Sequence, residues 1–120
     1  MSKILVVEDN ADNMALLDEI LEDANYEMLS AIDAEKGIAL LESHDVDLIL
    51  MDISLPKMSG LDAIQIIKDD VKNCYIPIIA LTAHAMQLDK ENALSAGADA
   101  FLTKPIDEDE LLQTMQGMLK

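Results

Sequence analysis

The chain has 120 residues, the size of one ordinary domain with one hydrophobic core. Apolar residues make up 51% of it, and this content excludes an intrinsically disordered chain. Eight Lys and no Arg against 24 Asp plus Glu give a formal net charge of −16, which repels the phosphates of nucleic acids and the anionic surface of a membrane. We therefore expect no direct contact with nucleic acid and none with a membrane.

Two further features concern the location of the protein. The longest apolar runs, such as residues 4–7 and 48–51, are four residues long, whereas a helix needs ~20 apolar residues to span a bilayer. The lone cysteine, Cys74, cannot form a disulfide within the chain. Both features predict a cytoplasmic protein.

Short apolar runs alternate with longer segments of helical period along the whole chain. The runs predict strands at 4–7, 28–32, 46–51, 78–81 and 101–102. Apolar residues at steps of three and four predict helices within 14–24, 38–41, 61–67, 85–96 and 111–119. Strands that are joined by helices run parallel, with helices on both faces of the sheet. We expect one α/β domain over residues 1–120, built from five such units, with no output domain after it.

Three local signals mark the ends of helices and their packing. Gly97 follows the fourth expected helix, where a left-handed closing residue is favoured. The acidic residues 107–109 lie where the last helix begins, at the positive end of its dipole. Residues 85–96 carry the weakest apolar stripe, so we expect this helix to be the mobile one.

Polar side chains follow four of the five expected strands. Glu8 and Asp9 come after the first strand, Asp52 after the third, Thr82 after the fourth and Lys104 after the fifth. Ligands of an open parallel sheet bind beyond the carboxyl ends of its strands. Each residue alone has a simpler interpretation as a loop residue, a helix cap or half of a surface ion pair. Their joint placement at one edge of the sheet favours a functional site.

Three of these residues are carboxylates. At roughly 4 Å two like charges repel by about 1 kcal/mol in water, and by more in a protein interior. The trio therefore calls for a cation, and oxygen ligands without histidine or thiolate favour Mg²⁺, for which Mn²⁺ can substitute. A flavin or dinucleotide site is disfavoured, because it needs a first loop of glycines or hydroxyls that cradles phosphate, and Glu8, Asp9 and Asn10 stand there.

Several motifs together give a resemblance to a known family. The motifs are ILVVEDN at 4–10, DLILMDISLP at 47–56 followed by Gly60, ALTA at 80–83, AGAD at 96–99 and Lys104-Pro105. Over the whole chain they resemble the receiver domain of two-component response regulators, with the family's separations of 30 residues from Asp52 to Thr82 and 22 from Thr82 to Lys104. The resemblance implies a flavodoxin-like, doubly wound, five-stranded parallel sheet of order 2-1-3-4-5 with five helices.

The resemblance also implies a metal-assisted phosphoacceptor. Asp52 would accept a phosphoryl group from a phosphohistidine of a sensor histidine kinase or a histidine phosphotransfer protein. Glu8, Asp9, Asp52 and the backbone carbonyl of Ser54 would hold the Mg²⁺. Lys104 would contribute positive charge to the phosphoryl group, and the Lys104-Pro105 peptide would be cis. Phosphoryl transfer requires mainly positioning and charge neutralisation, which these groups supply.

A switch follows from the same resemblance. Thr82 would assist the transfer and move toward the phosphoryl group, and Phe101 would turn inward behind it, although a plain core role for Phe101 is the simpler interpretation from sequence. The fourth helix, fifth strand and fifth helix would then present a changed face to a downstream protein target, or to a second copy in a phosphorylation-dependent dimer. Ser54 and His84 occupy positions expected to set the lifetime of the phosphoryl group. The protein would assist its own modification without being an enzyme.

Two alternatives stay open at this point. An aspartate-nucleophile hydrolase of the haloacid dehalogenase kind also uses Mg²⁺, but it needs a second Asp two residues after the first, where Ser54 stands. A phosphorylation-independent adaptor would keep the fold without using the site. It would bind its partner equally well after Asp52→Asn.

Overall fold

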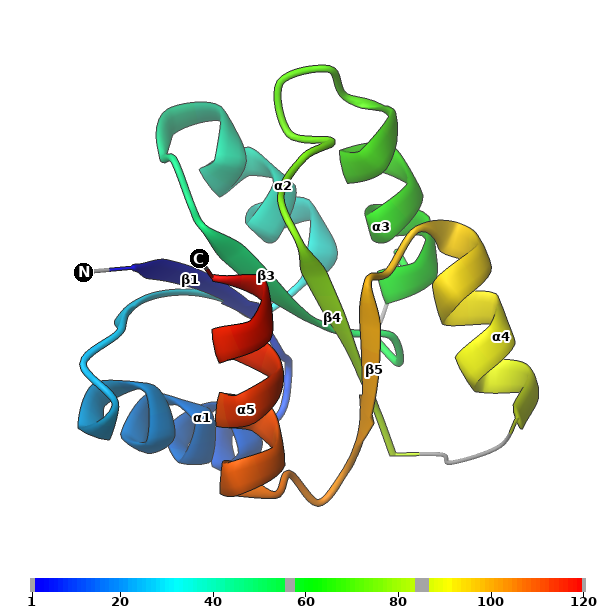
Figure 1. Cartoon of the computed structure of the whole chain (residues 1–120). Helices are drawn as coiled ribbons and strands as arrows, with labels where there is room; N and C mark the ends of the chain where they lie inside the picture. The colour runs from blue at the N-terminus through cyan, green and yellow to red at the C-terminus, as the bar shows by residue number, and fades with distance from the viewer. Residues whose placement is uncertain (1, 56–57, 84–86, 120) are drawn as a thin grey trace.

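Five parallel strands form the centre of the molecule. The computed structural model describes residues 2–55, 58–83 and 87–119, with side chains left undescribed at 87–89. The strands are β1 (Lys3–Val7), β2 (Glu27–Ala31), β3 (Leu48–Asp52), β4 (Ile78–Thr82) and β5 (Ala100–Thr103). They lie in the order β2-β1-β3-β4-β5 and every pair is parallel (Figure 1). The expected doubly wound fold and its strand order are confirmed.

Helices cover both faces of this sheet. The helices are α1 (Ala11–Asp23), α2 (Ala34–Ser43), α3 (Gly60–Asp69), α4 (Gln87–Ala96) and α5 (Glu108–Met118). Figure 1 shows α1 and α5 on one face and α2, α3 and α4 on the other. The start of the helix expected at 85–96 lies outside the described residues, and so does His84. None of the described helices has the length and apolar composition needed to cross a bilayer.

The two helical layers enclose two apolar cores, one on each face of the sheet. All five residues of β3 and of β4 are buried, as expected for central strands that are covered on both sides. Successive side chains of a strand point to opposite faces. Ile49 and Met51 accordingly pack on the side of α2, α3 and α4, and Leu48 and Leu50 pack on the side of α1 and α5.

The helix ends follow local side-chain chemistry. In the described part of the chain, four helices begin at an N-cap residue whose side-chain oxygen accepts the backbone N–H three residues on: Asn10, Asp33, Ser59 and Asp107. Each such cap stabilises its helix by about 1 kcal/mol. The expected acidic start of the last helix is therefore confirmed. Gly97 has φ +118° directly after α4, which confirms the predicted left-handed closing residue.

One boundary differs from the sequence-based expectation. Ile32 was expected within the second strand, but β2 ends at Ala31, and Ile32 is 58% exposed. The last ladder bond to β2 runs from the Glu8 N–H to the Ala31 carbonyl, and Asp33 already caps α2. Ile32 is thus the single connecting residue between the strand and the cap, and its apolar side chain stays at the surface.

Candidate functional site

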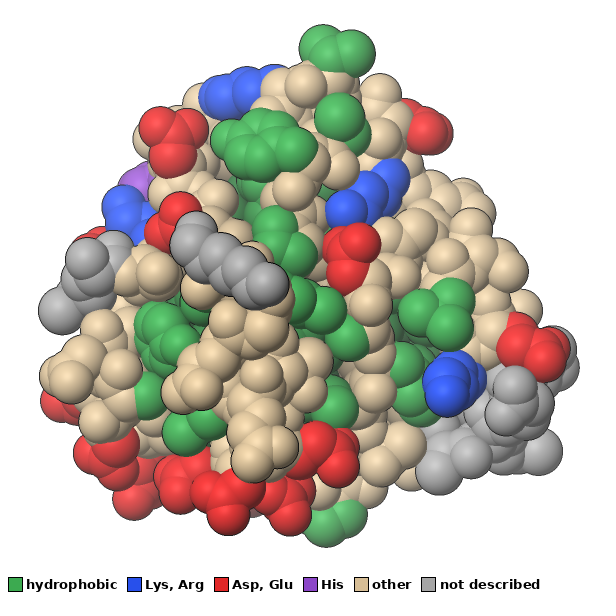
Figure 2. Space-filling model, viewed as in Figure 1, with side chains coloured by type: hydrophobic (Ala, Val, Ile, Leu, Met, Phe, Trp, Pro, Cys, Tyr) green, Lys and Arg blue, Asp and Glu red, His purple; other side chains and the backbone are tan. Residues whose placement is uncertain are grey.

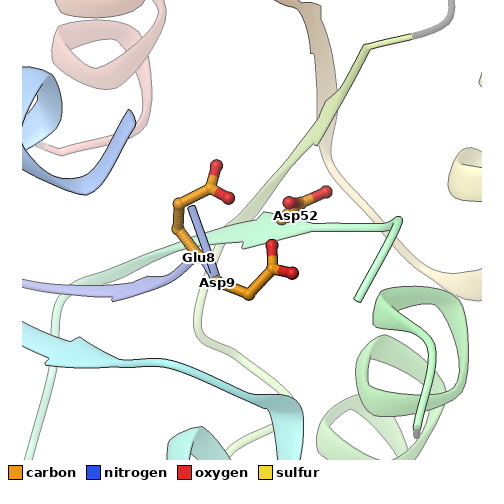
Figure 3. A group of neighbouring side chains, drawn as sticks. All are labelled: Glu8, Asp9 and Asp52. Atoms are coloured by element: carbon orange, nitrogen blue, oxygen red, sulfur yellow. The ribbon is translucent and has the colours of Figure 1, made fainter. Parts of the chain in front are cut away.

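The carboxylates of Glu8, Asp9 and Asp52 meet at the carboxyl edge of the sheet. Asp52 is the last residue of β3, and Glu8 and Asp9 directly follow the neighbouring strand β1. One oxygen from each of the three lies within 4.8 Å of the other two (Figure 3). Glu8 and Asp52 are 1% and 2% exposed, whereas Asp9 lies at the surface. The structure therefore brings the three predicted acids together.

Lys104 brings an ammonium into this cluster from the loop after β5. Its Nζ lies 2.6 Å from Glu8 Oε1 and 3.0 Å from Asp52 Oδ2. The contact with Glu8 is an ion pair, and Glu8 Oε1 has no hydrogen-bond partner of good geometry among the described residues. The Lys104 backbone N–H donates to the Thr82 carbonyl at 2.7 Å, and the Lys104-Pro105 peptide is cis, as the resemblance implied. The simpler interpretation of Lys104 as a surface ion pair is wrong, since its side chain is only 14% exposed.

The burial of these charges shifts two pKa values. Burial raises the pKa of Glu8 above its ordinary value, although the close contact with the Lys104 ammonium acts against this rise. Burial by itself lowers the pKa of the Lys104 ammonium, but the carboxylates of Glu8 and Asp52 outweigh it, so the pKa of Lys104 is raised. The site thus holds a firmly charged lysine beside an acid that resists ionisation.

Backbone N–H groups hold the other oxygen of both buried acids. The Ser54 N–H donates to Asp52 Oδ1 at 2.9 Å, and the Asn10 N–H donates to Glu8 Oε2 at 3.1 Å. In each case the donor stands two residues after the acid, in the loop that leaves the strand. Each carboxylate is therefore fixed on one side by its own loop and on the other side faces Lys104.

Gly60, the first residue of α3, contributes to the site through close backbone contact. A Cβ atom placed on it would overlap the carbonyl oxygen of Asp52 and lie 2.5 Å from Ile53 Cα. Only glycine allows α3 to begin this close to the end of β3. The sequence offered Gly60 as part of a family motif, but it carried no signal of this contact, because the contact joins two elements in space.

The two residues expected to form a switch lie on β4 and β5. Thr82 is the last residue of β4 and is 1% exposed. Phe101 is a residue of β5 and lies opposite Ala80 of β4. Its half-buried side chain packs against the core on the side of α4. Asp52, at the end of β3, pairs with Leu81 of β4. Thr82 follows Leu81 and so lies one residue beyond the partner of Asp52. Strand pairing therefore brings Thr82 to the same edge as the acids.

The donors of the cluster fit a hard divalent cation. Among residues 2–55, 58–83 and 87–119, three carboxylates meet one ammonium, so an excess of negative charge remains where Glu8 and Asp52 are shielded from water. Glu8 Oε1 also lacks a well-formed hydrogen bond. Oxygen ligands of this kind suit Mg²⁺ or Mn²⁺ better than softer metals.

Comparison with known proteins agrees with this site. The family model of the response regulator receiver domain matches residues 4–116. The polar-differentiation response regulator DivK of Brucella ovis is 38% identical over 116 residues, which cover 97% of this chain and 94% of DivK.

Two solved structures are similar to the whole fold. The receiver domain of a sensor histidine kinase from Pseudomonas aeruginosa PAO1, with a magnesium ion coordinated in its active-site cleft, has a TM-score of 0.92 and 36% identity and covers 98% of this chain and 97% of that one. Chemotaxis protein CheY4 of Vibrio cholerae has a TM-score of 0.93 and 28% identity, with 99% of each chain covered. The chain belongs to the receiver domain family of two-component response regulators.

Proposed function

We propose that this protein is a single receiver domain that takes a phosphoryl group onto Asp52 and passes the signal on through protein contacts. Membership in the receiver family makes phosphorelay signalling its general role. The observation that carries the specific proposal is the placement of Asp52: a buried carboxylate at the end of a central strand, with its Oδ2 3.0 Å from the Lys104 ammonium. The cytoplasmic location expected from sequence stays a prediction.

The chemistry is a transfer between a nitrogen and an oxygen. A carboxylate oxygen of Asp52 attacks the phosphorus of a phosphohistidine on a kinase or phosphotransfer protein and forms the new P–O bond. The P–N bond breaks, and the imidazole leaves with its electron pair. Lys104 lies where it stabilises negative charge on the transferred group, and the Ser54 N–H keeps Asp52 oriented.

Glu8, Asp9, Asp52 and the backbone carbonyl of Ser54 would hold a Mg²⁺ ion in this site, and Mn²⁺ could take its place. When bound, the ion neutralises charge on the phosphoryl oxygens. The magnesium-bound receiver of the Pseudomonas kinase supports this assignment, as does the cluster of three carboxylates within 4.8 Å. Ser54 and His84 are proposed to set the lifetime of the phosphoryl group.

The output is proposed to run through Thr82 and Phe101. The phosphoryl group adds roughly one and a half to two negative charges at Asp52. The Thr82 hydroxyl would move toward this charge and Phe101 would turn into the vacated space, changing the face made by α4, β5 and α5. A downstream protein, or a second phosphorylated copy, would bind the changed face. No step makes the protein a turnover enzyme for a separate substrate.

The experiment that tests the acceptor is intact mass spectrometry after incubation with acetyl phosphate, with and without Mg²⁺. We expect one added phosphoryl group on the wild type, only with the metal, and none on Asp52→Asn. Asp69→Asn, which removes an exposed acid at the end of α3, is the matched control and should be phosphorylated like the wild type. A phosphoryl group that persists on Asp52→Asn would assign the acceptor elsewhere.

The adaptor alternative makes the opposite prediction. An adaptor would show no added mass with acetyl phosphate or with a phosphorylated histidine donor, and its partner would bind Asp52→Asn and wild type equally well. A partner that binds only the phosphorylated protein would exclude this alternative.

A further inference from the structure

The outer edge of β2 offers unpaired backbone groups. β2 lies at one end of the sheet, and within the part of the chain that the structure describes it pairs only with β1. Its Glu27 N–H donates to Ser2 and its Ala31 carbonyl accepts from Glu8. The direction of these groups alternates along a parallel strand, so the N–H and C=O of Met28 and Ser30 point away from the sheet. This edge can pair with another extended chain.

The edge also lacks the features that usually prevent such pairing. Natural sheets protect their edges with prolines, lysines or charges that point inward. β2 begins at Glu27, which pairs with Lys3, but residues 28–32 after it read MLSAI and contain neither a proline nor a charge. Ile32 directly follows the last residue of β2, and it is 58% exposed. From Met28 to Ile32 the edge therefore carries no charged side chain, and Ser30 is its exposed polar residue.

An open hollow flanks the edge on each face of the sheet. On the α2 side, a hollow of about 470 Å³ is lined by Ala31, Lys36, Ala39 and Leu40 together with Ser30 and Ile32. On the α1 side, a second hollow of about 410 Å³ has Met14, Ala15 and Met28 among its lining residues, again with Ser30 and Ile32. Neighbouring side chains of an added strand would point to opposite faces and so enter the two hollows in alternation.

The charge around the second hollow specifies the partner further. Glu8, Asp9 and Asp18 line it, and the chain as a whole carries a net charge of −16. Basic residues beside the apolar ones would therefore be attracted. A second copy of this chain is disfavoured as the occupant, because it would bring the same negative charge to the edge.

We propose that the β2 edge binds an extended segment of a partner protein, which adds as a sixth strand beside Met28 and Ser30. The segment places adjacent apolar side chains into the two hollows and carries Lys or Arg next to them. This surface goes beyond the proposed phosphoryl transfer. Asp52 and Lys104 line neither hollow, while Glu8 and Asp9 of the proposed metal site also line the second one.

The test uses the full chain and a defined probe, the peptide acetyl-Lys-Lys-Val-Ile-Val-Thr-Lys-amide, in an NMR titration with amide hydrogen exchange. We expect the peptide to shift the backbone signals of residues 28–32 and to slow exchange at the Met28 and Ser30 N–H groups. A peptide with Glu in place of each Lys should bind more weakly. A peptide that is N-methylated at its three central residues should also bind more weakly, because it retains the side chains but lacks the donors for pairing.

Two variants of the protein locate the effect. Ser30→Pro removes an outward N–H without removing a bond to β1, and Ile32→Lys places a charge between the hollows while leaving the backbone unchanged. Each should weaken binding about tenfold, the effect of a lost hydrogen bond or a lost apolar contact. Val71→Lys makes the same change of charge at a residue that is 92% exposed and lines neither hollow, so it should bind like the wild type.

Several results would overturn the proposal. These are no binding of the lysine peptide by the wild type, equal binding of the N-methylated peptide, or shifts centred away from residues 28–32. A dimer of the wild type, detected by ultracentrifugation and abolished in Ser30→Pro, would assign the edge to a second copy. Ile32→Lys keeps the test valid if Ser30→Pro does not fold.

Discussion

At the scale of single residues, the site combines burial with an excess of negative charge. Glu8 and Asp52 are almost completely buried, yet one lysine is their only cationic partner among the described residues. A buried carboxylate without full compensation costs stability. The buried carboxylates of the site therefore lower the free energy of unfolding of the metal-free protein, which leads to two predictions.

The first prediction concerns Glu8 and pH. Because its pKa is raised above 4.5, the folded protein holds this proton to a higher pH than the unfolded chain does. The free energy of unfolding should therefore fall as pH rises from about 4.5 through the folded pKa. Glu8→Gln removes this dependence, and without metal it should be more stable than the wild type at neutral pH by about 1 kcal/mol.

Urea unfolding at a series of pH values measures this difference. The difference in the free energy of unfolding between Glu8→Gln and the wild type should disappear toward pH 4.5. Glu19→Gln, which removes an exposed acid in the middle of α1, is the control for the loss of one charge. A difference in the free energy of unfolding that stays constant with pH would contradict the assignment of the pH dependence to Glu8.

The second prediction concerns the coupling of Lys104 to Asp52. Lys104→Met leaves two buried carboxylates without a cation and should destabilise the metal-free protein by about 3 kcal/mol. In the double variant with Asp52→Asn the loss should be smaller than the sum of the single effects by at least about 1 kcal/mol. Lys36→Met, at an exposed lysine of α2, should change stability by less than about 0.5 kcal/mol. Additive effects in urea unfolding would show that the ion pair contributes nothing.

At the scale of elements, the site depends on how closely helices approach the ends of strands. Asn10, Ser59 and Asp107 begin their helices at the carboxyl edge of the sheet, so the chain turns there within a few residues of each strand. α3 begins so close to the end of β3 that no side chain fits at Gly60. The position of Asp52 is thus tied to the start of a helix that is eight residues further along the chain.

Gly60→Ala tests this contact. Its methyl group would overlap the Asp52 carbonyl, so α3 and the end of β3 must separate, and we expect a loss of about 2 kcal/mol together with slower phosphorylation of Asp52. Gly117→Ala is the matched control, because no atom lies within 4 Å of the added methyl group in α5. It should stabilise the protein by about 0.5 to 1 kcal/mol. Thermal unfolding and phosphorylation by acetyl phosphate measure both variants, and equal behaviour of the two would contradict the close-contact argument.

At the scale of the whole molecule, acidic side chains dominate the electrostatics. The net charge of −16 is carried on a molecule with a radius of gyration of 12.8 Å. Figure 2 shows acidic side chains crowded along one edge of the surface, near the start of α5, where Glu108, Asp109 and Glu110 form the first turn. Such a density of like charge destabilises the compact state by repulsion.

Salt should therefore stabilise this protein, in two separable ways. NaCl should raise the melting temperature by screening repulsion, in the wild type and in Asp52→Asn alike. Mg²⁺ at the same ionic strength should add a further increase in the wild type, because binding to the folded state stabilises it. This second increase should be much smaller in Asp52→Asn and Glu8→Gln. An equal response of all three proteins to Mg²⁺ in calorimetry would mean that the ion acts by screening alone.

The sequence by itself determined the architecture and the identity of the clustered acids. Alternating strand and helix periods specify parallel strands, and parallel strands bring the residues that follow them to one edge. Glu8, Asp9 and Asp52 could be placed together for this reason, and Gly97 and Asp107 could be assigned to helix ends from local chemistry. These inferences need only periodicity and chain connectivity, whereas the strand order that makes β1 and β3 neighbours came from the family resemblance.

Only the tertiary structure decided distances, burial and the shape of the surface. It made Lys104 a half-buried partner of Glu8 at 2.6 Å, placed Gly60 against the Asp52 carbonyl, and left hollows on both sides of the β2 edge. Each of these features joins residues from different elements, and their separation depends on side-chain packing across the sheet. Sequence periodicity reports which face a residue occupies, but not how closely its neighbours in space approach it.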